Sequence, residues 1–320
     1  MNRKSVLVTG SSGKIGMLLV HKLLKSGWHV YGLSSKNSVG LHARHTHIKF
    51  DWASQNHAPL PQVDLIYHLA SQTSSYIARQ DIAKDVNENL ILTCKILKEV
   101  SKFDRAPLFV YPSSTTVYGF RNDLIINEHS KVDPQTFYDT SKLAAEMYIN
   151  QSVIEKWISA AYIFRLSNVY GSANKLYTND RGFVDSAIKN SLKKLDLTCY
   201  GTGKYTRDYI HITDVVEAFI KVSECTGNFN SEIFNLGTGI GTTIYDTLAV
   251  ITEEVSRAIG HNSKIKMLPF PIDSYDIEKR NAIVPPTKFI EFSGWQPKVN
   301  LRDGIRAAIN VELSKTGSNT

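Results

Sequence analysis

The stretch "SVLVTGSSGKIG", residues 5–16, joins an apolar run to a helical pattern through three glycines. The apolar run is typical of a buried strand, and Gly10 breaks it. The apolar residues that follow recur at the spacing of one helical face, and the pattern stops at Gly27: Ile15, Leu18, Leu19, Leu23 and Leu24. The stretch therefore predicts a strand and a helix, the first part of a βαβ unit.

The glycines of this stretch have the spacing GxxGxxG. Glycine permits a tight turn and lets backbone N–H groups approach a pyrophosphate at the positive end of the helix dipole. An ordinary glycine-rich turn has the same letters, but the position between a strand and a helix favours a dinucleotide site. The candidate cofactor-binding residues are Gly10, Ser12, Gly13, Lys14, Ile15 and Gly16. The later "YGTGKY" and "NLGTGIG" lack this context and are interpreted as turns.

The rest of the first half alternates β-branched strands with amphipathic helices, which predicts a parallel sheet covered on both faces. Helices are expected over residues 77–100 and 138–157. Near residue 169 the alternation weakens, and we expect a second lobe of loops and small helices. The fold class is therefore α/β: a Rossmann-type doubly wound parallel sheet over residues 1–168, with a smaller mixed C-terminal substrate-binding lobe over residues 169–320. The segment at about 207–237 is expected to return to the first domain.

Composition restricts the class of protein. The 320 residues are 42% hydrophobic and 21% charged, which is typical of a globular chain. No apolar run approaches the ~20 residues of a membrane helix, and "MNRKSVLVTG" enters a strand at once, so we expect a cytoplasmic protein without a membrane partner. The cysteines are scattered and indicate no metal site. The net charge of +7 is spread without a basic run, so we expect an ordinary basic surface and no nucleic acid. Such a surface would also suit a substrate that carries phosphates.

A tyrosine four residues before a lysine is a candidate acid/base pair, because on a helix both lie on one face and an ammonium favours the phenolate. The pattern occurs three times: Tyr138/Lys142, Tyr200/Lys204 and Tyr275/Lys279. Only the first opens a long amphipathic pattern, and only it has a hydroxyl partner in "PSSTTVYG", at the expected end of a strand where ligand sites of open sheets lie. Context therefore favours Tyr138 and Lys142.

With these residues the chain resembles the extended short-chain dehydrogenase/reductase family of nucleotide-sugar epimerases, dehydratases and 4-ketoreductases. The resemblance runs over nearly the whole length, through "TGSSGKIG", "IYHLAS", "NLILT", "PSSTTVYG", "YDTSK", "RLSNVYG", "GKYTRDYIHITDV", "FNLGTGIG" and "GWQPKVNLRDGI". It implies an NAD(P)-dependent enzyme acting on a nucleotide-diphosphate sugar, bound in the second lobe.

The resemblance also implies roles for single residues. Tyr138 would be the acid/base, Lys142 would lower its pKa and hold the nicotinamide ribose, Ser114 would bind the reacting oxygen, and Thr116 would assist. Further cofactor contacts would be Asp51, Trp52, Leu69, Ala70, Ser71 and Asn89. The substrate's diphosphate would be bound by Asn168 and Arg207. Arg280 is either a second clamp or the cation of a surface salt bridge.

The reaction and the cofactor are left with alternatives. Dehydratases of the family carry Asp-Glu where this chain has Thr115 and Thr116, so 4,6-dehydration is not expected. The strand that would select the cofactor ends in Ser34, Ser35 and Lys36, with hydroxyls and a cation suited to a 2′-phosphate. This favours NADP over NAD, and with it a 4-ketoreductase over a 4-epimerase that retains NAD. The alternative is that these residues form an ordinary polar turn in an enzyme that binds NAD without a carboxylate at this strand end.

Three further expectations complete the analysis. The helices at 77–100 and 138–157 could pair across a twofold axis into a four-helix bundle, as in related dimers, which predicts a homodimer. A catalytically silent dinucleotide-binding regulator stays open, although Ser114, Tyr138 and Lys142 are all present. A nucleic-acid-binding protein is the remaining alternative, and a steep salt dependence on heparin would be its first sign.

Overall fold

The protein is described by a computed structural model covering residues 4–35, 42–50, 59–120, 124–172, 182–224 and 231–316. It divides into two compact units. The first consists of Met1–Gly119, Lys131–Arg165 and Ala218–Phe234, and the second of Phe120–Ser130, Leu166–Glu217 and Asn235–Thr320.

A seven-stranded sheet organises the first unit, with the strand order β3-β2-β1-β4-β5-β6-β10. The pairs β1/β2, β2/β3, β1/β4 and β4/β5 are parallel. The strands are β1 (Ser5–Thr9), β2 (His29–Ser34), β3 (His45–Lys49), β4 (Leu65–His68), β5 (Leu108–Ser114), β6 (Ala160–Leu166) and β10 (Glu232–Leu236). The order reverses between β1 and β4, which is the switch point where ligands of doubly wound sheets bind. The predicted Rossmann-type α/β class is confirmed.

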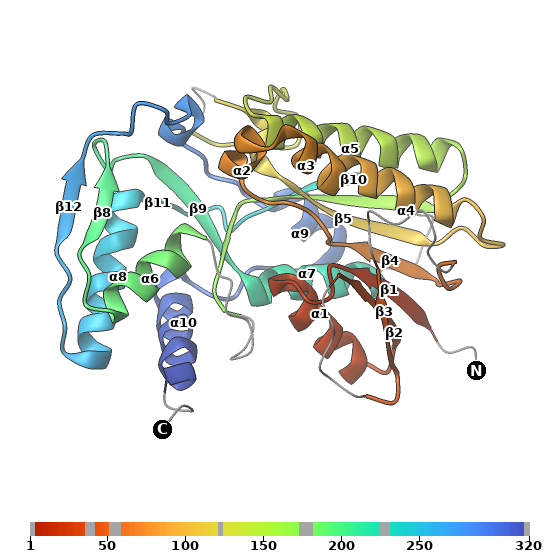
Figure 1. Ribbon diagram of the computed structural model, residues 1–320, viewed down its shortest axis with the longest axis horizontal. Helices are drawn as coiled ribbons and strands as arrows, with labels where there is room; N and C mark the ends of the chain where they lie inside the picture. Colours follow the sequence, from red (N-terminus) through yellow and green to blue (C-terminus); the bar gives the residue numbers. More distant parts are fainter. Residues whose placement is uncertain are drawn as a thin grey trace. The chain divides into compact units, whose positions relative to one another are not determined.

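Helices cover both faces of this sheet (Figure 1). On one side lie α2 (Ser75–Gln80), α3 (Ile82–Val86), α4 (Leu92–Val100) and α5 (Phe137–Ile154), and on the other α1 (Lys14–Lys25) and α7 (Ile212–Glu224). Ile66 of β4 belongs to the core under α4 and α5. Its neighbour Tyr67 points to the opposite face, where its hydroxyl donates to the carbonyl of Phe219 in α7 at 2.8 Å. Both faces are therefore apolar, as a covered parallel sheet requires.

The helix expected over residues 77–100 is interrupted. Asp81 ends α2 and begins α3, its carboxylate accepting from the backbone N–H of Lys84 at 2.8 Å. A π-helical turn, η1 (Asn87–Ile91), then joins α3 to α4. The extra residue of a π turn re-aims the side chains that follow, and such turns are frequent at functional sites.

The second unit is built from two small sheets and three longer helices. One sheet has the order β11-β9-β7 and the other pairs β12 with β8. Its strands are β7 (Asn168–Tyr170), β8 (Leu197–Tyr200), β9 (Thr206–His211), β11 (Gly241–Thr243) and β12 (Ile265–Leu268). Its helices include α6 (Phe183–Leu192), α8 (Ile244–Ile259), α9 (Thr287–Ser293) and α10 (Leu301–Thr316). The sequence-based expectation of loops and small helices was wrong here, because α8 and α10 each span 16 residues and enclose a core with α6.

Two short 3₁₀ helices complete the structure. η2 (Thr115–Tyr118) follows β5 directly, and η3 (Asp276–Lys279) precedes Arg280 in the second unit. Residues 160–170 are divided at Ser167 into β6 and β7, which belong to different sheets. No described helix combines the length and the apolar character needed to cross a membrane.

Candidate functional site

The glycine turn between β1 and α1 leaves no space for side chains. Gly10 has φ +65°, and a Cβ there would lie 2.8 Å from the backbone nitrogen of Ala70. A Cβ on Gly16 would overlap the carbonyl oxygen of Gly10. Gly13, which has no side chain to use as a cap, precedes the first residue of α1. The turn therefore brings backbone N–H groups and the positive end of α1 to one place, which fits the pyrophosphate of a dinucleotide.

The other residues predicted for this turn lie in the same short segment. Ser12 belongs to the turn, and Lys14 and Ile15 open α1; all three are half-buried. The end of β4 lies beside it, because Thr9 accepts a hydrogen bond from the backbone N–H of Ala70 at 3.1 Å. The half-buried residues at this strand end are Leu69, Ala70 and Ser71.

The strand expected to select the cofactor ends as predicted at Ser34. Ser34 is buried with 4% of its surface exposed, whereas Ser35 is exposed. The strand carries no carboxylate at this end. Lys36, Asp51 and Trp52, also predicted as cofactor contacts, lie outside the described residues.

The candidate catalytic residues gather at the carboxyl end of β5. Ser114 ends this strand, and its hydroxyl shares a hydrogen bond of 2.8 Å with that of Thr116. Tyr138 and Lys142 lie in the first turns of α5, which begins with a capping box formed by Thr136 and Asp139. Of the three Tyr-x-x-x-Lys pairs, this is the one within an α-helix: Tyr200 ends β8, and Tyr275 precedes a 3₁₀ turn.

The pKa of the Tyr138 phenol is raised in the structure, whereas the sequence analysis expected Lys142 to lower it. Burial and the charge of Asp139 raise its pKa, while a hydrogen bond with the Ser114 side chain lowers it. The Lys142 ammonium donates to the carbonyl of Pro112 at 2.6 Å and lies 4.1 Å from the ring centroid of Tyr111.

The pKa of Lys142 is also shifted from its usual value. Only 2% of its surface is exposed, and burial lowers its pKa to about 7 from 10.5, opposed by the negative charges of Glu146 and Asp85. A strongly shifted lysine beside a tyrosine and a serine at a strand end is typical of a catalytic site.

Sequence reasoning missed a buried ion pair beneath this site. Arg165 of β6 binds Glu146 of α5 through two hydrogen bonds, of 3.2 and 2.7 Å. The Ser113 hydroxyl also donates to Glu146, and the guanidinium lies 4.8 Å from the ring centroid of Tyr118. The residues are 19 positions apart, so no local pattern signals the pair. It joins α5 to the sheet directly below the candidate catalytic residues.

Asn89, predicted to contact the cofactor, lies in the π turn and is buried. Its side-chain oxygen accepts from the backbone N–H of Gln72 at 2.9 Å, and its amide nitrogen donates to Asp85 at 2.9 Å and to Ser141 at 3.0 Å. The amide thus links α3 to α5 internally.

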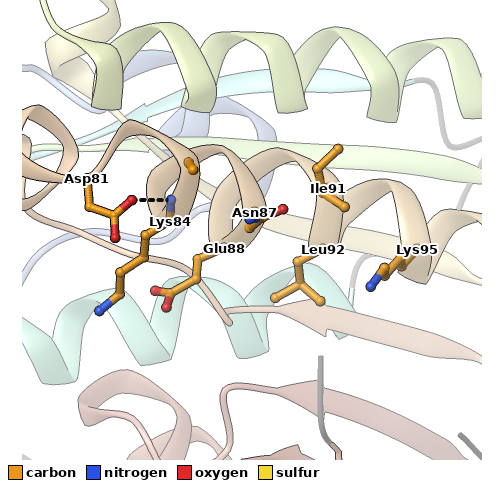
Figure 2. A pocket seen from close by; sticks show the side chains of 8 residues that line it. Asp81, Lys84, Asn87, Glu88, Ile91, Leu92 and Lys95 are labelled. Carbon is orange, nitrogen blue, oxygen red and sulfur yellow. Dashed lines mark hydrogen bonds between the residues drawn. The ribbon is translucent and has the colours of Figure 1, made fainter. Parts of the chain in front are cut away.

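A cavity of about 550 Å³ runs along the outer side of α3, η1 and α4 (Figure 2). Figure 2 shows the side chains of Lys84, Glu88 and Lys95 on one side of this helical stretch. The lining combines cations and acids with apolar groups: Asp81, Ala83, Lys84, Asn87, Glu88, Ile91, Leu92 and Lys95. Because the charges are mixed, the lining does not favour an anion over a cation.

The candidate substrate residues lie in the second unit. Arg207 is buried, and its guanidinium donates to the carbonyls of Thr206 at 3.2 Å, Glu278 at 2.7 Å and Arg280. Burial and the positive charge of Arg280 lower its pKa to about 10. Arg280 donates to the carbonyl of Ile277 at 2.9 Å. The structure thus brings two guanidinium groups together, close to the buried Tyr209, whose pKa burial raises and both positive charges lower.

Asp208, which the sequence analysis did not select, fixes the "NLGTGIG" turn beside these arginines. Its buried carboxylate accepts from the backbone N–H groups of Thr238, Gly239 and Val284 at 2.8–3.0 Å. Asn168 donates from its side chain to the carbonyl of Asp208 at 3.0 Å. The segments "YGTGKY" and "NLGTGIG", both predicted as turns, are turns in the structure. The second is held by the carboxylate of Asp208.

Comparison with known proteins decides the family. The model of the NAD dependent epimerase/dehydratase family matches residues 6–237. The chain belongs to this family. The resemblance to extended short-chain dehydrogenases is therefore confirmed, and with it the prediction of an NAD(P)-dependent nucleotide-sugar enzyme.

Individual relatives are distant but cover almost the whole chain. UDP-glucose 4-epimerase of Mycolicibacterium smegmatis is 28% identical over 97% of this chain and 99% of its own length. UDP-glucuronic acid decarboxylase 4 of Arabidopsis thaliana is 28% identical over 94% of this chain and 66% of its own length. UDP-glucuronic acid 4-epimerase from Bacillus cereus, solved with UDP-glucuronic acid and NAD, superposes with a TM-score of 0.80 at 23% identity, covering 97% of this chain and 99% of that one.

Proposed function

We propose that this enzyme carries out NAD(P)-dependent oxidation and reduction at C4 of the sugar of a nucleotide-diphosphate sugar. The observation that carries the proposal is the gathering of Ser114, Tyr138 and Lys142 at the carboxyl end of β5, with the Tyr138 phenol hydrogen-bonded to the serine. A phenol and a hydroxyl that share a proton are suited to binding and deprotonating one sugar hydroxyl.

Each residue then has a role in the proposed chemistry. Ser114 binds the oxygen on C4, and Tyr138 takes its proton as that carbon is oxidised. Lys142 stabilises the phenolate once the ammonium turns from the Pro112 carbonyl toward the tyrosine and the cofactor ribose. Thr116 holds the Ser114 hydroxyl in place. The glycine turn between β1 and α1 would hold the dinucleotide, whose nicotinamide would supply the hydride chemistry.

Among C4 reactions, we propose 4-epimerisation first. Support comes from full-length relatives named as 4-epimerases. Thr115 and Thr116, at the positions of a dehydratase's acid and base, offer no carboxyl group. The decarboxylase relative leaves loss of a sugar carboxylate as a related outcome of the same C4 oxidation.

The 4-ketoreductase favoured by the sequence analysis is the second candidate. Its support is the end of β2, where Ser34 and Ser35 offer hydroxyls and no carboxylate repels a 2′-phosphate. NADP as the cofactor belongs to this candidate. NAD belongs to the epimerase and is the dinucleotide bound by the similar solved structure.

The nucleotide diphosphate is proposed to bind in the second unit, on Arg207 and Arg280 with Asn168 beside them. Two like charges packed together gain when an anion is placed between them, and guanidinium groups match phosphate oxygens. In this assignment the first unit, near the predicted residues 1–168, binds the dinucleotide, and the second binds the sugar nucleotide.

A homodimer through α4 and α5 remains a proposal. Its support is the run of apolar side chains exposed on α5: Phe137 at 46%, Met147 at 65%, Tyr148 at 54% and Ile154 at 72%. Sedimentation of a monomer at working concentration would contradict it. The cytoplasmic location likewise remains a prediction, to be checked by cell fractionation.

The nucleotide released on denaturing the purified protein tests these alternatives. Stoichiometric NAD, together with interconversion of C4 epimers without added cofactor, supports the epimerase. Protein that releases no nucleotide and oxidises NADPH with a 4-keto sugar nucleotide supports the reductase. Cofactor binding without turnover of any UDP- or dTDP-sugar would leave the silent regulator.

A further inference from the structure

Asp85 is a buried acid that no role in the proposed chemistry uses. It lies in α3 with 0% of its surface exposed. Its Oδ1 accepts from the side-chain amides of Gln72 and Asn89, both at 2.9 Å. Its Oδ2 is buried without a hydrogen-bond partner among the described residues. A hydrogen bond with the Ser141 side chain also lowers the pKa of Asp85. All of these donors are neutral, and neutral donors compensate a buried carboxylate only in part.

The contacts of Asp85 lead to the candidate catalytic helix. Asn89, which donates to Asp85, also donates to the Ser141 hydroxyl at 3.0 Å. Ser141 in turn donates to the carbonyl of Tyr138 at 3.0 Å. Three consecutive hydrogen bonds therefore connect the Asp85 carboxylate with the backbone of the tyrosine. The π turn makes this possible, because it places Asn89 between α3 and α5.

Lys142 is the cation that needs a counter-charge here. The charges that interact with it are those of Glu146 and Asp85, and its own charge acts on His68. The other ionisable groups around it are the Tyr111 ring, 4.1 Å from the ammonium, Tyr138 and Asp139 on the same helix, and Arg165, which binds Glu146. Glu146 is bound by Arg165 through both carboxylate oxygens, and Asp139 caps its own helix. Burial lowers the pKa of His68 to about 3, so it carries no charge at neutral pH. Asp85 is thus the acid of this set that neither an arginine nor a helix terminus engages.

We propose that Asp85 is a positioning residue for Lys142: its carboxylate keeps the buried ammonium charged, and its amide contacts hold the first turns of α5 against α3. The consequence for turnover rests on the proposed function, because only an acid/base Tyr138 needs a charged lysine beside it. The electrostatic part does not depend on that function.

The signs of the pKa shifts agree with this role. Burial lowers the pKa of Lys142, and the negative charge of Asp85 raises it. Conversely, burial raises the pKa of Asp85, and the charge of Lys142 is among the groups that lower it. Each group therefore stabilises the charged form of the other. A nearby opposite charge is worth about one to three pKa units, and even the lower value decides whether a lysine that titrates near neutrality is charged.

NMR titration of the cofactor-free protein tests the electrostatic part. The lysine Cε resonance absent from Lys142→Met identifies Lys142, and its midpoint is followed in wild type and in Asp85→Asn. The midpoint should fall by about one pH unit in the variant, because the counter-charge is lost while the shape is kept. Asp81→Asn is the matched control: the same change four residues away, at an exposed acid, should leave the midpoint in place.

Two further measurements keep the proposal open to refutation if Asp85→Asn folds poorly. In wild type, the Cγ resonance of Asp85 should respond at the Lys142 midpoint, and a flat response would overturn the proposal. Asp85→Glu keeps the charge and should restore most of the wild-type midpoint. An unchanged Lys142 midpoint in a folded Asp85→Asn would equally overturn it.

Turnover provides the second readout. In Asp85→Asn, the pH at which kcat falls on the alkaline side should decrease together with the Lys142 midpoint. Gln72→Met removes one hydrogen bond to Asp85 but keeps the charge, so it should not decrease this pH. If wild type turns over no nucleotide sugar, the proposed function fails and the NMR midpoints still decide the role of Asp85. If wild type turns over a nucleotide sugar, but Asp85→Asn changes neither the alkaline fall of kcat nor the titration midpoint of Lys142, the proposed function is supported and the role of Asp85 is refuted.

Discussion

Lys142 donates a hydrogen bond of 2.6 Å from Nζ to the carbonyl oxygen of Pro112. The bond gives the buried ammonium a partner inside the protein, at the end of β5. Burial raises the pKa of the neighbouring acid/base candidate, Tyr138.

Replacing Tyr138 by Phe should lower turnover by about 10²-fold or more, the usual worth of a positioned acid/base. The ring is kept, so dinucleotide affinity, measured by the quenching of intrinsic fluorescence, should stay within about twofold. Near-normal turnover in this variant would remove Tyr138 from the proposed role.

Lys142→Met should change the pH dependence of stability as well as abolish turnover. The folded-state pKa of Lys142 is lowered to about 7 from 10.5. Between these values the unfolded chain binds the proton and the folded chain does not, so this group makes stability rise with pH over that range. Urea unfolding at pH 7, 8 and 9 should show a smaller rise in the variant than in wild type. Equal slopes would mean that Lys142 titrates normally.

The sequence alone was sufficient for the parts of the structure that local patterns encode. The strand-to-helix turn at Gly10 is determined by glycine spacing and by the apolar periodicity on either side. Tyr138 and Lys142 could be chosen over two similar pairs because a helical pattern follows them and a serine-rich strand end precedes them. These signals extend over about 30 residues or fewer, within one βα unit.

What the sequence could not provide are contacts between distant segments. The pairing of Glu146 with Arg165, and of Asp85 with Gln72, depends on how α3, α5 and the sheet pack, and no spacing rule encodes it. The lowered pKa of Lys142 has the same origin, because it depends on burial by residues from several elements. The helices α8 and α10 were underestimated because the strands around them are short, three to six residues, and leave only a weak alternating pattern in the sequence.

Gly10→Ala should abolish dinucleotide binding and destabilise the protein by about 1–3 kcal/mol or more. The new Cβ would meet the backbone of Leu69 and Ala70 at 2.9 and 2.8 Å. Gly27→Ala is the control, because Gly27 also has a positive φ, +87°, but no atom lies within 4 Å of its Cβ position. Calorimetry should show a strain of only about 1 kcal/mol there, with binding intact. Similar losses of binding in both would mean that the phosphate cradle is elsewhere.

Arg165→Met should destabilise the protein by about 3–5 kcal/mol, since it leaves the Glu146 carboxylate buried without its cation. Adding Glu146→Gln should recover part of this loss. By contrast, Lys221→Met breaks an exposed pair with Glu224 and should cost at most about 1 kcal/mol. Urea unfolding measures all four free energies. A loss below about 1 kcal/mol for Arg165→Met would show that solvent reaches the pair.

Ser35→Asp should move cofactor preference toward NAD. A carboxylate after β2 accepts a hydrogen bond from the ribose 2′-hydroxyl and repels a 2′-phosphate. Ser35 is chosen over Ser34 because it is exposed, whereas an acid at the buried position would lower stability as well. The ratio of kcat/KM for NAD(H) over NADP(H) should rise by about tenfold, equivalent to about 1.4 kcal/mol. Ser35→Asn, similar in shape but neutral, should change the ratio much less. A ratio equal in the two variants would show that this strand end does not contact the ribose, and cofactor choice would then have to lie with other residues.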